Sequence, residues 1–166
     1  MRADMPDTII KEIKTFAYNS PANRMPTPDK DIIFDEPLVQ FANGDDAIFT
    51  EYKSIISPEH LTPREILAEV YEKDPADLPQ RLSVVSWILP IMEKTRKSNS
   101  YETKVPSRLW SHTRWYGEIF NDAMREHVVG YLTEKGYMAT APMKTPGRVP
   151  MITARVSGQS MRPSLT

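Results

Sequence analysis

Residues 83–90 read SVVSWILP, and this stretch decides the fold class that we expect. It has the length of a strand, is rich in β-branched and aromatic residues, and is closed by Pro90. Because the run is apolar at nearly every position instead of every second one, it is typical of a strand whose sheet is covered on both faces. We therefore expect an α/β or α+β sandwich and not a helical bundle.

Four segments around this strand repeat apolar residues with the spacing of an α-helix. The third has the clearest end signal, because Thr62 suits the N-cap, Pro63 the first helical position and Glu65 the far end of a capping box. Gly136 is well placed to end the fourth and longest segment. The expected helices cover residues 8–19, 47–56, 63–73 and 117–136.

We expect the apolar stripes of the second and third helices to face the core. The two stripes consist of Ile48, Phe49, Tyr52, Ile55 and Ile56, and of Ile66, Leu67, Val70 and Tyr71. An Asn43-Gly44 turn and a cap at Asp45 or Asp46 precede the second helix.

The remaining segments are irregular or short. Residues 20–37 contain four prolines without helical period, so we expect an extended arm over the surface, of the kind that packs on a partner subunit in a homodimer. Residues 137–142 and 149–156 are interpreted as short strands. The expected organisation is an N-terminal helix and proline-rich arm in residues 1–43, an α/β core in residues 44–156 and an irregular tail in residues 157–166.

A chain of 166 residues with 40% hydrophobic content is long enough for one core. Its longest apolar run, around residues 84–89, falls far short of the ~20 residues that a membrane span needs. The start MRADMPD has no apolar signal core. We therefore expect a cytoplasmic protein without a membrane partner.

The chain contains no cysteine, which excludes disulfides, a thiol nucleophile and a cysteine-ligated iron–sulfur cluster within it. Its three histidines, His60, His112 and His127, show none of the short spacings that mark zinc sites. We expect no metal centre built from this chain.

The net charge of −1 conceals an asymmetry along the chain. Residues 1–92 carry 9 basic and 16 acidic side chains, whereas residues 93–114 carry 6 basic and 2 acidic ones. Three interpretations of this basic segment are open. It is a solvated loop face, a site for phosphate or another anion, or a nucleic-acid surface, which the slightly acidic balance of the whole chain favours least.

The stretch SHTRWYGEIFND, residues 111–122, places polar and aromatic side chains just before the longest expected helix. Free backbone N–H groups and the positive end of the helix dipole favour an anion there, so Arg114 and Tyr116 are candidate ligand contacts. The alternative is structural, with Trp115 and Tyr116 packed on the sheet and Arg114 paired with a helix carboxylate. His112 is either a general acid or base or a hydrogen-bonding surface group.

Four side chains are therefore candidates for binding a cofactor or anion, and no catalytic residue is assigned. The candidates are Arg114, Tyr116, His112 and Lys104. His127 falls on the apolar stripe of the longest helix and is interpreted as a satisfied core residue. Three carboxylates on that helix are interpreted as a solvated face and not as a paired-carboxylate site. They are Glu118, Asp122 and Glu126.

Several stretches, taken in order, resemble the N-terminal region of iron–sulfur proteins related to epoxyqueuosine reductase. They are DEPLVQFANGDDAIFTEYK, LTPREIL, SVVSWILPIMEKTRKSN, PSRLWSHTRWYGEIFN and EKGYMATAPM, and they cover most of residues 35–145. RWYGEIFN stands where the reductases carry an Arg-Tyr and a downstream Asp-Tyr-His ahead of the equivalent helix. The resemblance lies in pattern and element order and not in a catalytic motif.

This resemblance implies an α/β core related to flavin nitroreductase-like folds, incomplete in this chain, followed by a ferredoxin-like module with cysteine-ligated 4Fe–4S clusters. In epoxyqueuosine reductases and their reductive dehalogenase relatives, the core also holds a cobalamin. This sequence departs from the family pattern because it lacks the cysteine-rich module and, with it, an evident electron path to a corrinoid. The chain alone is therefore expected to be catalytically silent.

Two functions follow as hypotheses. The first is the N-terminal, cluster-free portion of an iron–sulfur oxidoreductase, completed by a C-terminal cluster module or an equivalent partner. The second is a stand-alone, non-catalytic domain for interaction or dimerisation. Exposed apolar surface favours the first, and a surface covered by polar groups favours the second. A phospholigand-binding module built on the basic segment has less support.

Overall fold

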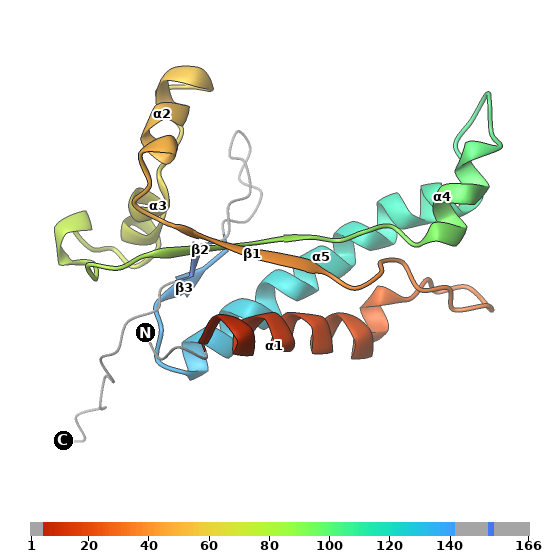
Figure 1. Ribbon diagram of the computed structural model, residues 1–166, viewed down its shortest axis with the longest axis horizontal. Helices are drawn as coiled ribbons and strands as arrows, with labels where there is room; N and C mark the ends of the chain where they lie inside the picture. Colours follow the sequence, from red (N-terminus) through yellow and green to blue (C-terminus); the bar gives the residue numbers. More distant parts are fainter. Residues whose placement is uncertain (1–4, 142–152, 155–166) are drawn as a thin grey trace. The chain divides into compact units, whose positions relative to one another are not determined.

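The computed structural model describes residues 5–141 and the backbone of residues 153–154 (Figure 1). Within these residues the expected mixed α/β class is confirmed, with five α-helices, two short 3-10 helices and four β-strands. The elements are α1 (Met5–Asn19), η1 (Pro21–Asn23), β1 (Leu38–Asn43), α2 (Ala47–Ile55), α3 (Pro63–Val70), η2 (Pro75–Asp77), β2 (Ser83–Ile88), α4 (Glu93–Ser100), α5 (Arg108–Glu134), β3 (Ala139–Thr140) and β4 (Thr153–Ala154).

The strands form one sheet in the order β1-β2-β4-β3. β4 pairs in the antiparallel direction with both of its neighbours, so that Ala154 lies opposite Ser83 of β2 and opposite Ala139 of β3. β2 is the strand that the sequence predicts, and Val85 at its centre is fully buried. Ile88 at its end is 65% exposed, so the expected cover on both faces is wrong for the end of the strand.

Two compact units make up the chain, and neither is a continuous segment. The first unit consists of Met1–Met5, Gln40–Ser86 and Val129–Thr166, and the second of Pro6–Val39 and Trp87–Val128. The chain passes between the units within α1, β1, β2 and α5. This division differs from the three consecutive segments expected from the sequence, the last of which, residues 157–166, lies outside the described residues.

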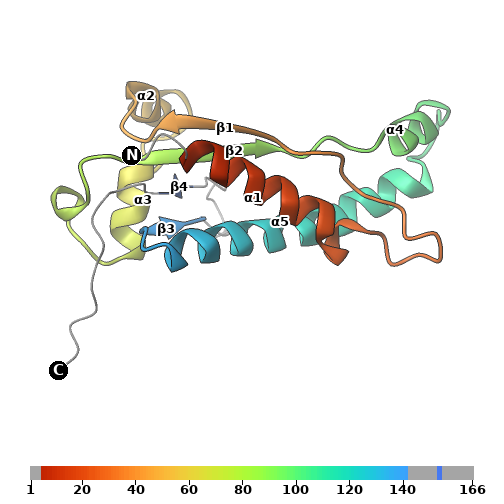
Figure 2. The same cartoon turned by 60° about the horizontal axis from the view of Figure 1, so that its bottom comes forward.

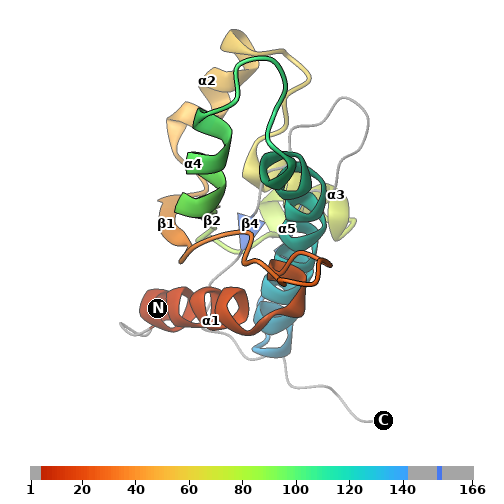
Figure 3. The same ribbon diagram turned by 90° about the vertical axis from the view of Figure 1, so that its right-hand side faces the viewer.

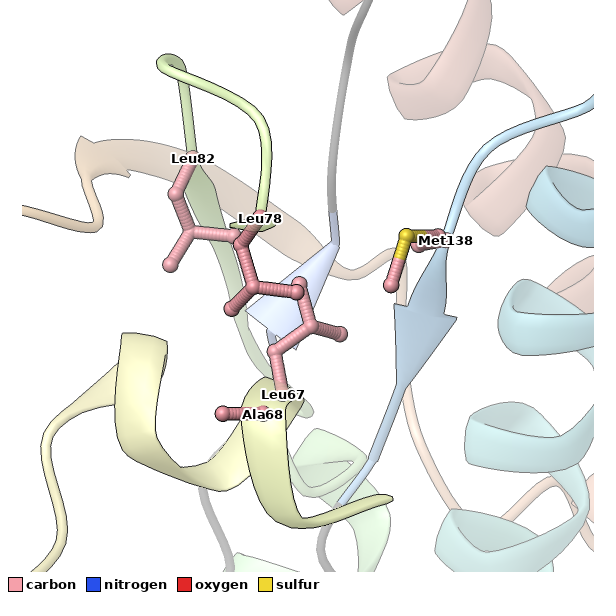
Figure 4. Close-up of a cluster of buried hydrophobic side chains, with 5 residues drawn as sticks. All are labelled: Leu67, Ala68, Leu78, Leu82 and Met138. Atoms are coloured by element: carbon pink, nitrogen blue, oxygen red, sulfur yellow. The ribbon is translucent and has the colours of Figure 1, made fainter. Parts of the chain in front are cut away.

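The first unit has a core built around α3, the loop that follows it and the residue before β3 (Figure 4). Its buried side chains are Leu67, Ala68, Leu78, Leu82 and Met138, with Tyr71 packed against them. The predicted capping box of α3 is confirmed, because the Thr62 hydroxyl accepts from the Glu65 N–H and the Glu65 carboxylate accepts from the Thr62 N–H. The cap fixes where the helix starts, and the apolar cluster fixes which face it buries.

Tyr71 and Arg64 connect α3 to its neighbours in the first unit. The Tyr71 hydroxyl lies 3.0 Å from both the amide nitrogen and the carbonyl oxygen of Ala139, accepting from the first and donating to the second. Arg64 donates to both carboxylate oxygens of Asp45, at 2.6 and 2.7 Å, and to the carbonyl of Pro79. The hydrogen bond to Asp45 is the main reason that the pKa of Arg64 lies above its ordinary value.

The second unit is built from α1, the segment that follows it and the first part of α5 (Figure 2). Its buried apolar side chains include Ile9, Ile13, Ala17, Met25, Ile33, Phe120, Met124 and Val128. The Phe120 ring stacks on Phe16 at a centroid distance of 6.1 Å and lies 5.8 Å from Phe34. Gly117 is required for this packing, because a Cβ atom there would lie 2.6 Å from Cζ of Phe34.

The proline-rich segment 20–37 does not simply lie over the surface, which corrects that expectation. Met25 and Ile33 are only 1% and 0% exposed. Asn23 is also buried, and its side-chain amide donates to the carbonyls of Ala17 and Phe34, each at 3.0 Å, while its oxygen accepts from the Phe34 N–H. The Asn23 side chain thus provides hydrogen-bond partners for backbone groups that no helix or strand pairs. Because these groups are satisfied, part of the segment can be buried in the core.

α2 forms where the sequence predicts it, with Asp46 as its N-cap, but its apolar stripe is not in the core. None of its residues is buried, and Ile55 and Ile56 are 68% and 57% exposed. In α3, Ile66 is buried as expected, whereas Val70 is exposed. The apolar periodicity therefore predicts both helices correctly, but it does not predict which of their apolar residues are buried.

The basic segment is not wholly a loop, which is a second correction. Residues 93–100 form α4, and a turn leads from α4 into α5 (Figure 3). Two side chains of α4 hold the end of that turn: the Ser98 hydroxyl lies 2.8 Å from the Ser107 hydroxyl, and the Asn99 side chain accepts from the Ser107 N–H. β1 was not expected from the sequence.

Among the helices of the described residues, none combines the length and apolar character needed to cross a bilayer.

Candidate functional site

The stretch SHTRWYGEIFND lies inside α5 and not at its entrance, so the expected site at a helix N-terminus is wrong. α5 begins at Arg108, nine residues before Gly117, where the sequence predicts its start. The buried Ser107 provides the start signal, because its hydroxyl accepts from the N–H of Trp110 at 3.2 Å. Only the first four N–H groups of a helix lack internal partners, and those near residues 114–116 come too late to bind an anion.

The structure brings two of the four candidate side chains together. His112 and Tyr116 are one turn apart on α5, half-buried, with ring centroids 5.8 Å apart in an edge-to-face arrangement. Arg114 is exposed, and because residues two apart on a helix point in nearly opposite directions, it lies away from this pair. Lys104 is exposed in the turn before α5. The four side chains therefore do not converge on one ligand.

The structural alternative for this stretch also needs correction. Trp115 is 71% exposed, so it does not pack on the sheet. Within the described part of the chain, Arg114 forms no ion pair with a helix carboxylate. The arginine that pairs with helix carboxylates is the buried Arg125, which contacts Asp122 and lies 3.7 Å from Glu118. Asp122 and Glu118 pair with this arginine from the surface, since their side chains are 60% and 43% exposed. Glu126 is exposed as well, so the three carboxylates lie on a solvated face, as expected.

His127 is a satisfied, half-buried residue, as its place on the apolar stripe predicts. Its Nε2 atom lies 2.8 Å from the Glu12 carboxylate, and its ring stacks on Phe16 with centroids 4.1 Å apart. These contacts join α5 to α1 within the second unit. These two contacts give His127 a structural role, because its Nε2 atom and one face of its ring already have partners.

The shifted ionisable groups of the described residues also serve structural purposes. Burial raises the pKa of Glu65, but the hydrogen bonds from Thr62 and the ammonium group of Lys53, 2.9 Å away, more than offset it, so the pKa lies below its ordinary value. A hydrogen bond to Asp31 raises the pKa of the exposed Lys94. Neither group faces a reacting centre.

The residues present do not fit an iron–sulfur cluster, because the chain has no cysteine. In the part of the chain that the structure describes, no group of three or more His, Asp or Glu side chains could hold a metal ion. The dispersed positions of Arg114, Tyr116, His112 and Lys104 do not form a cradle for a cobalamin either.

A concave site that the sequence did not predict lies in the second unit. It is a groove of about 300 Å³ between the last turn of α1 and residues 32–37, and we call it the α1 groove. Lys14, Ala17 and Tyr18 line one side, because residues spaced three and four apart share a helix face. Arg24 and Phe34 are among the residues of the other side. The spacing on α1 could have marked one wall, but the opposite wall depends on how the proline-rich segment folds back.

Comparisons of the chain with protein-family models, with curated proteins and with solved structures find no match. The family resemblance seen in the sequence therefore stays a prediction.

Proposed function

We propose that this chain is the cluster-free portion of a cytoplasmic iron–sulfur oxidoreductase related to the epoxyqueuosine reductases, with the first part of a nitroreductase-like core, and that it is not catalytic by itself. In this proposal the electrons come from 4Fe–4S clusters on a cysteine-rich module outside this chain. The completed core, and not Arg114 and its neighbours alone, would hold a cobalamin.

The observation that carries this proposal is the apolar surface that the chain leaves uncovered. Among the described residues, 12 large apolar or aromatic side chains are exposed, from Tyr18 in α1 to Ile119 in α5. Single exposed apolar residues are normal, but α2 buries no residue of its apolar stripe. A surface of this kind is what a docking module would cover.

The order of the elements supports the same proposal. β1, α2, α3, β2, α4 and α5 follow one another through the residues that carry the family resemblance. The longest helix is the last of these elements, as the resemblance implies, although it begins inside the basic segment and earlier than expected.

The source gene, read past the codon for Thr166, gives the first test. A reading frame that continues into cysteine-rich cluster motifs supports the oxidoreductase. A stop codon at that position removes the electron path and favours the alternative, a stand-alone interaction or dimerisation domain.

A second test measures the uncovered surface directly. We expect the isolated chain to enhance the fluorescence of a hydrophobic dye such as anilinonaphthalene sulfonate, and the double substitution Ile55→Ser and Ile56→Ser to reduce it, because both side chains are more than half exposed. The matched control, Thr50→Ser and Glu51→Gln, changes exposed polar residues of the same helix and should leave the signal unchanged.

Far-UV circular dichroism of each variant confirms that α2 is still formed. Dye binding that is absent in the unsubstituted chain, together with a dimer in light scattering, would contradict an uncovered docking surface and favour the dimerisation domain.

A further inference from the structure

We propose that the α1 groove binds a small organic anion with an apolar body, of the class of aryl and alkyl carboxylic acids, and that Arg24 recognises the carboxylate. The groove lies entirely within the second unit. It does not include the apolar stripe of α2, so this inference does not rest on the proposed function.

The walls of the groove are apolar over much of their length. Ala17 and the ring of Tyr18 come from α1, and Ile32 and Phe34 come from the segment opposite, with Met92 beside them. Small-molecule sites typically combine such walls with a few polar groups that fix orientation. The body of the ligand should therefore be apolar.

The two walls are joined by a buried side chain, so the groove is already formed without a ligand. The Asn23 amide donates to the carbonyl of Ala17 on the α1 side and to the carbonyl of Phe34 on the other side, and its oxygen accepts from the Phe34 N–H. Asn23 is only 4% exposed, and all three bonds are 3.0 Å or shorter. A groove held in this way loses little conformational freedom on binding.

Two cations and two carboxylates line the groove, so its formal charge is balanced and the local pairing decides which charge is available to a ligand. Lys14 and Glu36 neutralise each other, with Nζ and Oε1 2.5 Å apart. The Asp35 carboxylate keeps its charge, since it forms no ion pair with a described residue, but it is held at the backbone by the N–H of Glu36, from which it accepts at 2.8 Å. The Arg24 guanidinium forms no ion pair or side-chain hydrogen bond with any residue that the structure describes.

A free guanidinium beside an apolar wall matches the chemistry of a carboxylate on an apolar body. The planar fork of N–H donors can bind both oxygens of a carboxylate, which adds geometric selectivity to the charge. The volume of about 300 Å³ is at the small end of ligand sites, so it suits one ring with a short acid chain and not a large cofactor.

The test titrates the whole chain, labelled with ¹⁵N, with 4-phenylbutyrate and follows backbone amide shifts by nuclear magnetic resonance. We expect the amides of Lys14, Tyr18 and Arg24 to shift together, with a dissociation constant on the order of 1 mM. The matched amine, 4-phenylbutylamine, has nearly the same body and the opposite charge, and should produce shifts at these positions only at much higher concentration.

Three variants distinguish recognition of the carboxylate from non-specific binding. Arg24→Gln should raise the dissociation constant at least about tenfold, because it removes the charge and most of the fork. Ile32→Asp should weaken binding by placing a carboxylate in the wall. Arg96→Gln, which changes an exposed arginine of α4 that does not line the groove, should have no effect.

Unchanged amide dispersion away from the groove shows that each variant is folded. Equal binding of the acid and the amine would overturn the proposal, as would unchanged binding in both Arg24→Gln and Ile32→Asp. The absence of groove shifts at about 10 mM ligand, ten times the expected dissociation constant, would also overturn it.

Discussion

Gly117 and Gly130 are two glycines of the same helix with opposite structural roles. Both lie within α5, where glycine is intrinsically about 1 kcal/mol less favourable than alanine. A Cβ atom at Gly117 would lie 2.6 Å from Cζ of Phe34, whereas a Cβ atom at Gly130 would have nothing within 4 Å. Helix preference therefore favours alanine at both positions, whereas tertiary packing opposes it at Gly117 and is silent at Gly130.

We expect Gly117→Ala to lower the free energy of unfolding by about 1–3 kcal/mol, because Phe34 must move out of a packed aromatic cluster and overpacking outweighs the gain in helix preference. Urea unfolding followed by circular dichroism measures the change.

Gly130→Ala is the matched control, and it should raise the free energy of unfolding by about 0.5–1 kcal/mol, since only the helix preference changes. Equal stabilisation by both substitutions would show that Phe34 yields without cost and that the close approach at Gly117 is unimportant.

The start of α3 is an element whose stability should depend on pH. The pKa of Glu65 is lowered in the folded chain, so the folded state binds this proton less readily than the unfolded state does. Its contribution is therefore fully present above the unfolded value of about 4.3 and is lost as the pH falls through the lower folded value. The side chain is 40% exposed, so solvent screens the contribution and it stays small.

We expect Glu65→Gln to flatten the fall in stability between about pH 5 and pH 3, measured as the difference in urea midpoint from the unsubstituted chain. A pH profile for Glu65→Gln that is parallel to that of the unsubstituted chain would show that this carboxylate is not coupled to folding.

Thr62→Ala, which removes the other half of the capping box, should lower the free energy of unfolding by about 1 kcal/mol at neutral pH.

Helix starts were predictable where several local signals agree, and not where one signal misleads. At α3, Thr62, Pro63 and Glu65 all indicate the same start, and the structure confirms it. At α5, Gly117 suggested a start that is wrong, because its small size serves the contact with Phe34 and not a cap. The actual start depends on Ser107, which donates its N–H to Asn99 of α4 and shares a hydroxyl–hydroxyl hydrogen bond with Ser98. Sequence spacing does not reveal these contacts.

At the scale of the whole molecule, α2 should be the least protected of the longer helices in hydrogen exchange. Protection depends on buried contacts, and α2 has no buried residue, whereas α1 buries Ile9, Ile13 and Ala17. We expect peptides from α2 to exchange deuterium at least about ten times faster than peptides from α1 in the isolated chain, as measured by mass spectrometry. Equal protection would mean that something covers α2 in solution, and self-association would be the first cause to examine.

Which residues form the candidate site could not be predicted from the sequence. The candidates near Arg114 were chosen for a helix start that lies elsewhere. The α1 groove depends on residues 20–37 folding back along α1, and the prolines of this segment give no periodic pattern from which that could be predicted. Asn23 creates that fold-back with three hydrogen bonds over 6 and 11 residues, and no local pattern encodes such partners. The mixed α/β class was accessible because it depends on helical periodicity and on the composition and length of the strand at residues 83–90.

Tyr71 has a consequence for aggregation. β3 is the last strand of the sheet, and an outer strand offers unpaired backbone groups to any other chain that can add a strand. At Ala139 a single phenolic hydroxyl occupies both the donor and the acceptor of that edge. The Tyr71 side chain thus occupies the hydrogen-bonding groups that a strand from another chain would need. It blocks edge-to-edge pairing at Ala139 without adding a further strand to the sheet.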